Sequence, residues 1–297
     1  MNDVKEKLVD LLAQFTRLSS IRLPDDVLRK LHELSGSETS ERARFFYDAM
    51  LADLDMASSL MRPCCQDTGI IQYFVEAGSK SPYLDLLEDA LRQAVVLATD
   101  RTPLRHNCVE VFDEKNTGDN TGTRIPWIDW QVIPDNQDLS IYIYLAGGGC
   151  SLPGASKVLM PLEGYEGVLR FVFDQVTSYG INACPPLLLG IGIAGSAEVA
   201  AKLSKKALLR PIGSANGNER GHALEVKIEE AVNAIGIGPG GTGGAKSLLG
   251  VHVEQAGRHP ATLAVGLSTA CWAHRRAHII IHPDLSWEMP THQGAQL

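Results

Sequence analysis

The first sixty residues carry hydrophobic side chains at helical spacing. Over residues 4–18 apolar positions recur every three or four residues, with Lys, Glu and Asp between them, which predicts a helix. A proline followed by two aspartates at residues 24–26 predicts a second helix start, because proline and acids both suit the first turn. That helix is predicted to end at Gly36, and a third to cover 41–60. Residues 1–62 are therefore predicted to form a helical layer.

Extended apolar runs and helical patterns alternate along the rest of the chain. Strands are predicted at 70–75, 108–112, 127–133, 140–146, 187–193, 248–254 and 263–268. Helices are predicted at 82–99, 164–178, 196–209 and 223–234. Loops are predicted at 213–221, at 236–244 and from Pro283 onward. Because no repeat or long linker divides the chain, we expect one domain over 1–297 of mixed α/β (α+β) class, in which residues 63–297 form a mixed sheet with helices beneath the N-terminal layer.

The composition is that of a globular protein, with 297 residues, 44% apolar and 21% charged. The net charge of −8 argues against a general nucleic-acid binder, which needs a concentrated basic surface. No apolar run approaches the roughly 20 residues of a membrane span, and the N-terminus lacks a signal-peptide pattern. We therefore expect a cytoplasmic protein that binds neither nucleic acid nor membrane and keeps its six cysteines reduced.

Three cysteines, Cys65, Cys184 and Cys271, fall at breaks in secondary structure beside Gly, Pro or polar residues. The chain has no C-x-x-C, which argues against a zinc ribbon or a ferredoxin-type cluster. Three distant thiolates that converge on one pocket would suit a four-iron cluster with one iron left without a protein ligand. Such an iron is a Lewis acid that can hold a substrate hydroxyl. The alternative is that these are buried thiols, since free cysteine is among the most buried residue types.

Polar residues near these cysteines have both a chemical and a structural interpretation. Asp67 is a candidate general acid or base for a departing hydroxyl, or the acceptor of a turn hydrogen bond. Gln66 orients a substrate or caps the same turn. Arg105 can clamp a carboxylate through two parallel hydrogen bonds, or is an ordinary surface arginine. His259 is a functional candidate or simply a satisfied polar group.

Three glycine-rich stretches suggest close approach of a backbone. The triple glycine at 147–149 closes a predicted strand with a backbone that a ligand can approach. Gly190-x-Gly192-x-x-Gly195 matches the dinucleotide fingerprint, but no acidic residue follows about 20 positions later. These glycines alternatively let a helix pack closely on a strand. The loop at 236–244 lacks the ending of a P-loop, although its N–H groups could cradle an anion.

Several motifs, taken in order, resemble the N-terminal half of the class I fumarases, a family of iron–sulfur hydro-lyases. They include CQDTG at 65–69, PLRHN at 103–107, NTG at 116–118, GGGCSLPG at 147–154, GYEG at 164–167, ACPP at 183–186, RPIGS at 210–214, and Arg258-His259 leading to CWAHRR at 271–276. Within the family they are most similar to the alpha subunits of enzymes that dehydrate L(+)-tartrate, which share a cysteine after the triple glycine. The resemblance implies the alpha-domain fold of that family.

The resemblance also implies a set of site residues. It implies a labile [4Fe-4S] cluster held by Cys65, Cys184 and Cys271. It implies catalytic roles for Asp67 and His259, and substrate contacts at Gln66, Arg105, Gly147, Gly148 and Gly149. Cys64 is not among the implied ligands.

The resemblance further implies a partner. The family has a second, swivelling domain that supplies the catalytic base and several carboxylate-binding Arg and Lys residues, and that part does not occur before Leu297. We therefore expect an alpha subunit that needs a beta, swivel-domain subunit and assembles as an α2β2 heterotetramer. The expected reaction removes water from L(+)-tartrate, a small dicarboxylate, to give oxaloacetate. Alternatives are a two-subunit fumarase acting on malate and fumarate, a non-enzymatic iron–sulfur sensor and, on the glycine motif alone, a nicotinamide dehydrogenase.

Overall fold

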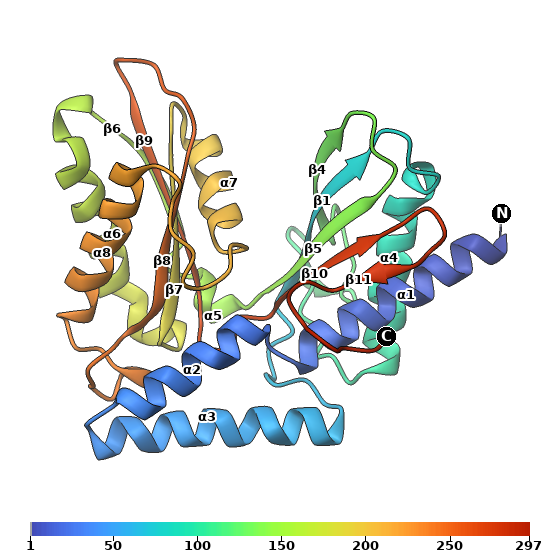
Figure 1. The fold of residues 1–297 in the computed structure, drawn as a ribbon, viewed down its shortest axis with the longest axis horizontal. Helices are drawn as coiled ribbons and strands as arrows, with labels where there is room; N and C mark the ends of the chain where they lie inside the picture. The colour runs from blue at the N-terminus through green and yellow to red at the C-terminus, as the bar shows by residue number, and fades with distance from the viewer. Residues whose placement is uncertain (1) are drawn as a thin grey trace. The chain divides into compact units, whose positions relative to one another are not determined.

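The computed structural model describes residues 2–297, and the chain folds into two compact units (Figure 1). Unit 1 consists of the residues up to Asp25, Ala52–Gly147 and Arg275–Leu297, and unit 2 consists of Asp26–Leu51 and Gly148–His274. Each unit contains a sheet with parallel and antiparallel pairs together with packed helices, so the predicted mixed α/β class is confirmed. That residues 1–297 act as one functional domain stays a prediction.

Most predicted elements are confirmed within a few residues. The helices are α1 (Asn2–Ile21), α2 (Asp25–Ser37), α3 (Glu41–Leu60), α4 (Leu84–Arg101), α5 (Gly148–Ser151), α6 (Gly164–Tyr179), α7 (Ala197–Ala207) and α8 (Glu219–Asn233). The strands are β1 (Ile70–Gly78), β2 (Val109–Glu110), β3 (Lys115–Asn116), β4 (Trp127–Ile133), β5 (Leu139–Ala146), β6 (Ala155–Leu159), β7 (Leu187–Ala194), β8 (Leu248–Gln255), β9 (Leu263–Ala270), β10 (Arg276–Ile281) and β11 (Trp287–Glu288).

Three predictions about local structure were wrong. The extended run at 108–112 contains only the two-residue strand β2, and the tail from Pro283 contains β11. The predicted loop at 213–221 overlaps α8, which begins at Glu219 because the Asn218 side chain caps it by accepting hydrogen bonds from two backbone N–H groups. Strands β6 and β10 were not predicted.

Unit 1 is a five-stranded sheet covered by two helices. The strand order is β11-β10-β5-β1-β4, with β1 and β4 parallel and the other pairs antiparallel. The predicted stripes of α1 and α4 pack on each other and on the sheet, and Leu12, Leu91 and Ile143 are among the fully buried residues of this core. The three predicted N-terminal helices exist, but they are divided. Helix α1 lies in unit 1, α2 lies almost entirely in unit 2, and the residues of α3 belong to both.

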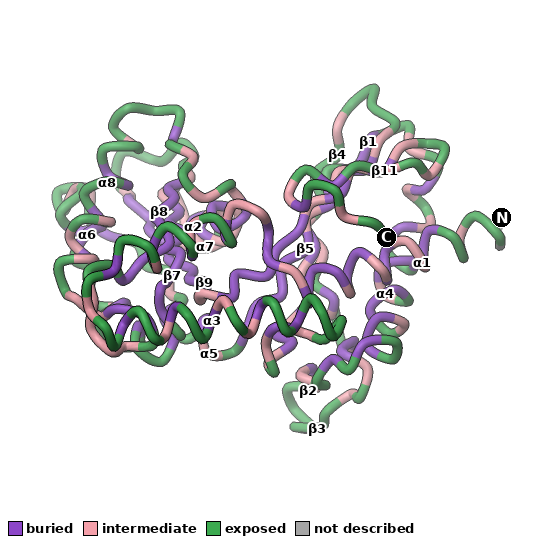
Figure 2. The backbone as a smooth tube through the Cα atoms, turned by 60° about the horizontal axis from the view of Figure 1, so that its bottom comes forward, coloured by how far each residue is buried: buried purple, intermediate pink, exposed green. Residues whose placement is uncertain are grey.

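Unit 2 is a four-stranded sheet covered on both faces. The order is β6-β9-β7-β8, with α6 and α8 on one face and α7 on the other (Figure 1). All eight residues of β9 are buried, and Figure 2 shows β7, β8 and β9 as buried backbone. A sheet buried on both faces needs near-continuous apolar strands, which is why the uninterrupted runs at 187–193, 248–254 and 263–268 were recognisable.

Helix α7 lies very close to the sheet because glycines face it. A Cβ atom on Gly190 would lie 2.2 Å from the carbonyl oxygen of Ser204, and one on Gly192 would lie 2.0 Å from that of Ala200. Gly266 of β9 approaches Ala200 in the same way, at 2.6 Å. Two glycines of the apparent dinucleotide fingerprint are thus explained by the packing of a helix on a strand, the alternative interpretation of that motif.

Gly192→Ala should therefore destabilise the protein, because the added methyl group meets helix backbone that must move. Overpacking of this kind costs about 1–3 kcal/mol and occasionally more. The free energy of unfolding from urea denaturation measures the loss. Gly250→Ala in β8 is the matched control, since the nearest atom to its Cβ would be a Leu188 methyl carbon at 3.7 Å, an ordinary contact. Equal losses for the two variants would contradict the packing argument.

A buried carboxylate ties the segment after α7 to β8. Glu225 accepts hydrogen bonds from the N–H groups of Val253 (2.8 Å) and Asn216 (2.9 Å) and pairs with Arg210 (2.9 Å). Burial alone would raise the pKa of the Glu225 carboxyl, but these hydrogen bonds and the Arg210 charge outweigh it and hold the pKa below its ordinary value of 4.5. The ionised form is therefore the one that stabilises the fold.

Acid should remove this contribution. Because the pKa of Glu225 is lower in the folded than in the unfolded chain, its ionisation stabilises the protein above pH 4.5, and the gain is lost as the pH falls below that value through the folded pKa. We expect Glu225→Gln to have a lower free energy of unfolding than wild type at pH 7 and a smaller dependence on pH between pH 5 and 3. Parallel pH profiles for the two proteins would contradict this assignment.

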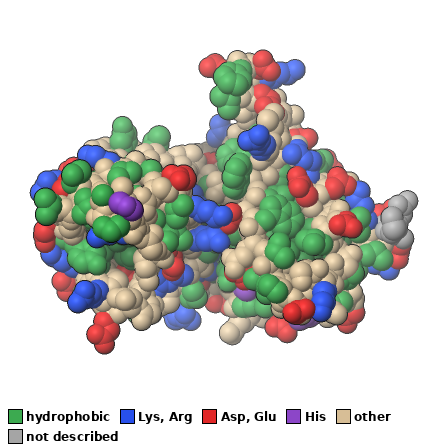
Figure 3. Space-filling view, turned by 90° about the horizontal axis from the view of Figure 1, so that it is seen from above, with side chains coloured by type: hydrophobic (Ala, Val, Ile, Leu, Met, Phe, Trp, Pro, Cys, Tyr) green, Lys and Arg blue, Asp and Glu red, His purple; other side chains and the backbone are tan. Residues whose placement is uncertain are grey.

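On the face of the molecule seen in Figure 3, acidic, basic and apolar side chains are interspersed, and no large patch carries a single sign of charge. Of the helices formed by residues 2–297, none combines the length and apolar character that a membrane crossing requires.

Candidate functional site

The turn at Cys65–Gly69 lies at the start of β1, directly beside the end of β5. Ile70 of β1 pairs with Ala146 of β5, and Gly147 follows at once. Gly69 has φ of +74°, and a Cβ atom on it would lie 2.5 Å from the Ala146 carbonyl carbon and 2.8 Å from the Gly147 nitrogen. Only glycine permits this contact between the two backbones. Unit 1 thus brings the predicted cluster turn and the first residue of the triple glycine together.

Asp67 is held by two hydrogen-bond donors on one carboxylate oxygen. Its Oδ1 accepts the Gly69 N–H at 2.7 Å, which confirms the turn hydrogen bond considered for it, and it also accepts the Asn107 side-chain amide. The neighbouring Gln66 side chain is exposed. Asn107 lies in the PLRHN motif, two residues after Arg105, and nothing in the sequence around it indicates this contact with Asp67.

Arg105 lies on the exposed segment that connects α4 to β2. Its planar guanidinium can bind a carboxylate through two parallel hydrogen bonds. The same segment carries Asn107, whose side-chain amide donates to Asp67.

Unit 2 brings Cys184 and Cys271 to the same end of its sheet. Cys184 stands just before β7 and Cys271 just after β9, and these strands are antiparallel neighbours, with Leu188 paired to Ala270. The N–H of Trp272 donates to the Cys184 carbonyl at 3.1 Å. The turn after Cys184 is held on another side by the Gly240 N–H, which donates to the next carbonyl along the chain at 2.9 Å.

The remainder of the triple glycine lies beside the Cys184 turn in unit 2. A Cβ atom on Gly149 would lie 3.2 Å from the carbonyl oxygen of Asn182, two residues before Cys184. The Thr269 hydroxyl donates to the Cys150 carbonyl and so ties this loop to β9 near its end. Gly148 is exposed, and Gly149 is half-buried.

The six cysteines fall into two groups by exposure. Cys64, Cys108 and Cys150 are buried, whereas Cys65 and Cys271 are partly exposed and Cys184 is exposed. Burial raises the pKa of the Cys64 thiol to about 12 and also raises the pKa of Cys108. Because metals bind the thiolate, the chemistry of the donors favours the partly exposed group and disfavours the buried one. The three predicted ligands, Cys65, Cys184 and Cys271, are the three exposed or partly exposed thiols, and they fit an iron–sulfur cluster.

Cys184 has a further distinguishing feature. Its φ of 57° lies in the left-handed region, which a residue with a side chain seldom adopts, and the hydrogen bonds on both sides of the turn hold it there. Backbone strain of this kind collects at functional sites.

His259 lies at the opposite end of the unit 2 sheet from Cys184 and Cys271. It sits in the exposed connection between β8 and β9, and the whole of β9 separates it from Cys271, a distance of about 25 Å at ~3.3 Å per residue. Its Nδ1 accepts the Ala261 N–H at 3.1 Å, and the Arg258 backbone packs on Gly195. Unit 2 therefore does not bring His259 to the cysteine end, and its catalytic role stays a prediction.

The glycine loop at 236–244 is not arranged to cradle an anion. Its N–H groups are largely used by the chain itself. Those of Gly238, Gly240 and Gly243 donate to Ser247, Pro185 and Ile237, respectively. The loop instead packs against Phe46 and Ile181 through Gly240 and Gly241.

The predicted site residues are thus distributed over both units. Cys65, Gln66, Asp67, Arg105 and Gly147 belong to unit 1, and Cys184, Cys271, Gly148, Gly149 and His259 to unit 2. Among residues 2–297, no set of three or more His, Cys, Asp and Glu side chains is gathered as a metal site.

Known proteins resemble this chain over nearly its whole length. The family model for fumarate hydratase (Fumerase) matches residues 9–280. The alpha subunit of L(+)-tartrate dehydratase from Escherichia coli strain K12 is 52% identical over 291 residues, which are 98% of this chain and 96% of that protein. The corresponding subunit of Shigella sonnei strain Ss046 gives the same values. A putative L(+)-tartrate dehydratase alpha subunit of Methanocaldococcus jannaschii is 36% identical over 275 residues, 91% of this chain and 96% of that protein.

These matches span both units and all of the motifs that carried the resemblance, so the predicted relationship is confirmed. The chain belongs to the fumarate hydratase (Fumerase) family.

Proposed function

We propose that this chain is the alpha subunit of an L(+)-tartrate dehydratase, a hydro-lyase that converts L(+)-tartrate into oxaloacetate and water. The observation that carries the proposal is the 52% identity, over 98% of the chain, to proteins that bear this name. The site chemistry supports it, since a carboxylate, an exposed arginine and partly exposed thiols are the groups a hydroxy-dicarboxylate dehydratase needs.

The same proposal includes a [4Fe-4S] cluster held by Cys65, Cys184 and Cys271. The exposure of these three thiols, against the burial of the other three, supports the choice of ligands. When bound, the cluster would supply Lewis acidity toward the substrate hydroxyl.

In this proposal each polar residue of unit 1 has a defined task. Asp67 transfers or holds a proton at the departing hydroxyl of the substrate. Arg105 binds a substrate carboxylate through its planar guanidinium, and Gln66 orients the same molecule. The backbone of Gly147–Gly149 allows close approach of the substrate. We assign no step to His259, because β9 keeps it from the cysteine end of its sheet.

The dehydration itself also needs a base. A proton leaves one substrate carbon, the hydroxyl leaves its neighbour as water, and the resulting enol becomes oxaloacetate. We propose that the base resides on a beta subunit and that the pair forms an α2β2 assembly in the cytoplasm. The name "subunit alpha" of the relatives supports a partner.

Turnover by the anaerobically prepared complex of the alpha and beta subunits tests the function. We expect L(+)-tartrate to be dehydrated with a kcat/KM well above that for malate, and the alpha subunit alone to be inactive. A much higher kcat/KM for malate would contradict the substrate assignment. It would instead support the second candidate, a two-subunit fumarate hydratase, which the name of the family model favours.

A further inference from the structure

The Asp67 carboxylate is one end of a connected series of hydrogen bonds in unit 1. The Nδ2 of Asn107 donates to Asp67 Oδ1, the same oxygen that accepts the Gly69 N–H at 2.7 Å. Two donors on one oxygen restrict the rotation of a carboxylate more than a single contact does. The orientation of Asp67 therefore depends on where Asn107 is held.

Asn107 is in turn held by Asn120. The Oδ1 of Asn120 accepts the Asn107 N–H at 2.8 Å, and its Nδ2 donates to the Thr99 hydroxyl at 3.1 Å. Asn120 is 2% exposed and has φ of 62°, a left-handed conformation that asparagine tolerates better than most residues. A buried amide with both ends used has one orientation, so Asn120 fixes the Asn107 backbone.

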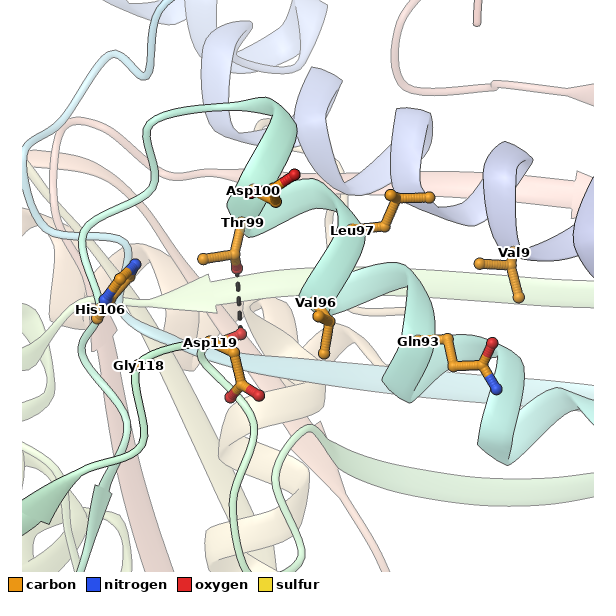
Figure 4. A pocket seen from close by; sticks show the side chains of 9 residues that line it. All are labelled: Val9, Gln93, Val96, Leu97, Thr99, Asp100, His106, Gly118 and Asp119. Carbon is orange, nitrogen blue, oxygen red and sulfur yellow. Dashed lines mark hydrogen bonds between the residues drawn. The ribbon is translucent and has the colours of Figure 1, made fainter.

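This series of hydrogen bonds ends at Thr99 of helix α4. The Thr99 hydroxyl donates to the Asp119 carbonyl at 3.2 Å, the hydrogen bond drawn in Figure 4. Thr99 and Asp119 line an open pocket of about 770 Å³, together with Val96 and Leu97 of the same helix. Helix α4 is packed in the core of unit 1, so Thr99 is a fixed anchor for this series of hydrogen bonds.

We propose that Asn107, itself fixed by Asn120, is the positioning residue for the Asp67 carboxylate. This inference rests on the proposed function for its catalytic consequence. A carboxylate that must meet a departing hydroxyl works only in a narrow range of orientations. A loss of orientation should lower kcat more than it changes KM, because the substitutions leave Arg105 and Gln66, the residues assigned to substrate binding, in the chain.

Asn107→Leu in the alpha–beta complex is the first test. This substitution keeps the branching and the number of heavy atoms of the side chain but removes the amide donor. We expect kcat for L(+)-tartrate to fall about 10- to 100-fold, with KM within about threefold of wild type. Asn120→Gly is the second test. The Asn107 side chain is still present in this variant, but the hydrogen bond that holds its backbone N–H is lost. Glycine suits the left-handed backbone at position 120, and we expect the same loss in kcat.

Asp119→Ala is the matched control. It breaks two hydrogen bonds of the same loop, those that Asp119 Oδ1 accepts from the N–H and the hydroxyl of Thr121, but none in the chain to Asp67. We expect its kcat to stay within about threefold of wild type. A loss as large as that of Asn107→Leu would mean that loop rigidity alone matters, and it would overturn the proposal.

Amide hydrogen exchange on the full alpha chain gives a readout that needs no turnover. Because Gly69 N–H donates to the oxygen that Asn107 positions, exchange at Gly69 should be about tenfold faster in Asn107→Leu and unchanged in Asp119→Ala. Unchanged exchange in Asn107→Leu would overturn the inference. A wild-type complex that does not dehydrate L(+)-tartrate would refute the proposed function instead, and the exchange test would still stand.

Discussion

Cys184→Ser should remove iron and acid-labile sulfide from the alpha chain and abolish turnover by the complex. The thiol is exposed, and its left-handed backbone is fixed by hydrogen bonds to its own and the next carbonyl, from Trp272 and Gly240. Iron–sulfur clusters are held by thiolates, and a serine hydroxyl is a far weaker ligand at neutral pH. Iron and sulfide content after anaerobic purification, together with kcat, measures the loss.

The control for this prediction comes from the adjacent pair Cys64 and Cys65. Cys65→Ser should reproduce the loss, whereas Cys64→Ser should keep its iron and sulfide, because burial raises the pKa of Cys64 to about 12 and keeps it a thiol. If Cys64→Ser lost the cluster and Cys65→Ser retained it, the ligand assignment in unit 1 would be wrong. Circular dichroism of each variant separates misfolding from loss of metal.

Asp67→Asn should lower kcat by about 10²–10⁴, the range for loss of a general acid or base. The substitution keeps the size of the side chain and an oxygen that can accept the Gly69 N–H, so the turn at 65–69 should persist. We therefore expect iron content and the free energy of unfolding to match wild type. Steady-state kinetics with L(+)-tartrate, read beside iron analysis of the same sample, checks the result.

The control position for this experiment is another aspartate, Asp135. It is an exposed turn residue whose carboxylate pairs with Lys80 at 2.8 Å. Asp135→Asn should have wild-type kcat, since an exposed ion pair contributes little. Turnover by Asp67→Asn within a few-fold of wild type would remove Asp67 from the chemistry. It would leave only the turn hydrogen bond as the role of that side chain.

Much of the fold was predictable because its strands are apolar without interruption and its helices carry clear stripes. Strand β10 was missed for a physical reason. It begins with Arg276, directly after Arg275, and both side chains are 1% exposed, so charged residues stand where a buried strand would be expected to be apolar. Strand β6 was missed because it is a short edge strand whose Lys157 and Ser156 break the apolar pattern.

The site was predictable only in part, since its contacts are non-local. Nothing in the sequence near Cys184 or Cys271 shows that β7 and β9 are antiparallel neighbours, which is what places the two thiols at one sheet end. The link from Asn107 to Asp67 likewise joins residues 40 positions apart. His259 and Cys271 are close in sequence, but the whole of β9 lies between them.

The most direct test is to count iron and acid-labile sulfide in the anaerobically purified wild-type chain and to record its Mössbauer spectrum. Our proposal predicts about four irons and four sulfides per chain, with one iron distinct from the other three. Serine at Cys65, Cys184 or Cys271 should each abolish that signal. A wild-type chain that binds no iron, or one in which all three serine variants keep the full spectrum, would contradict it.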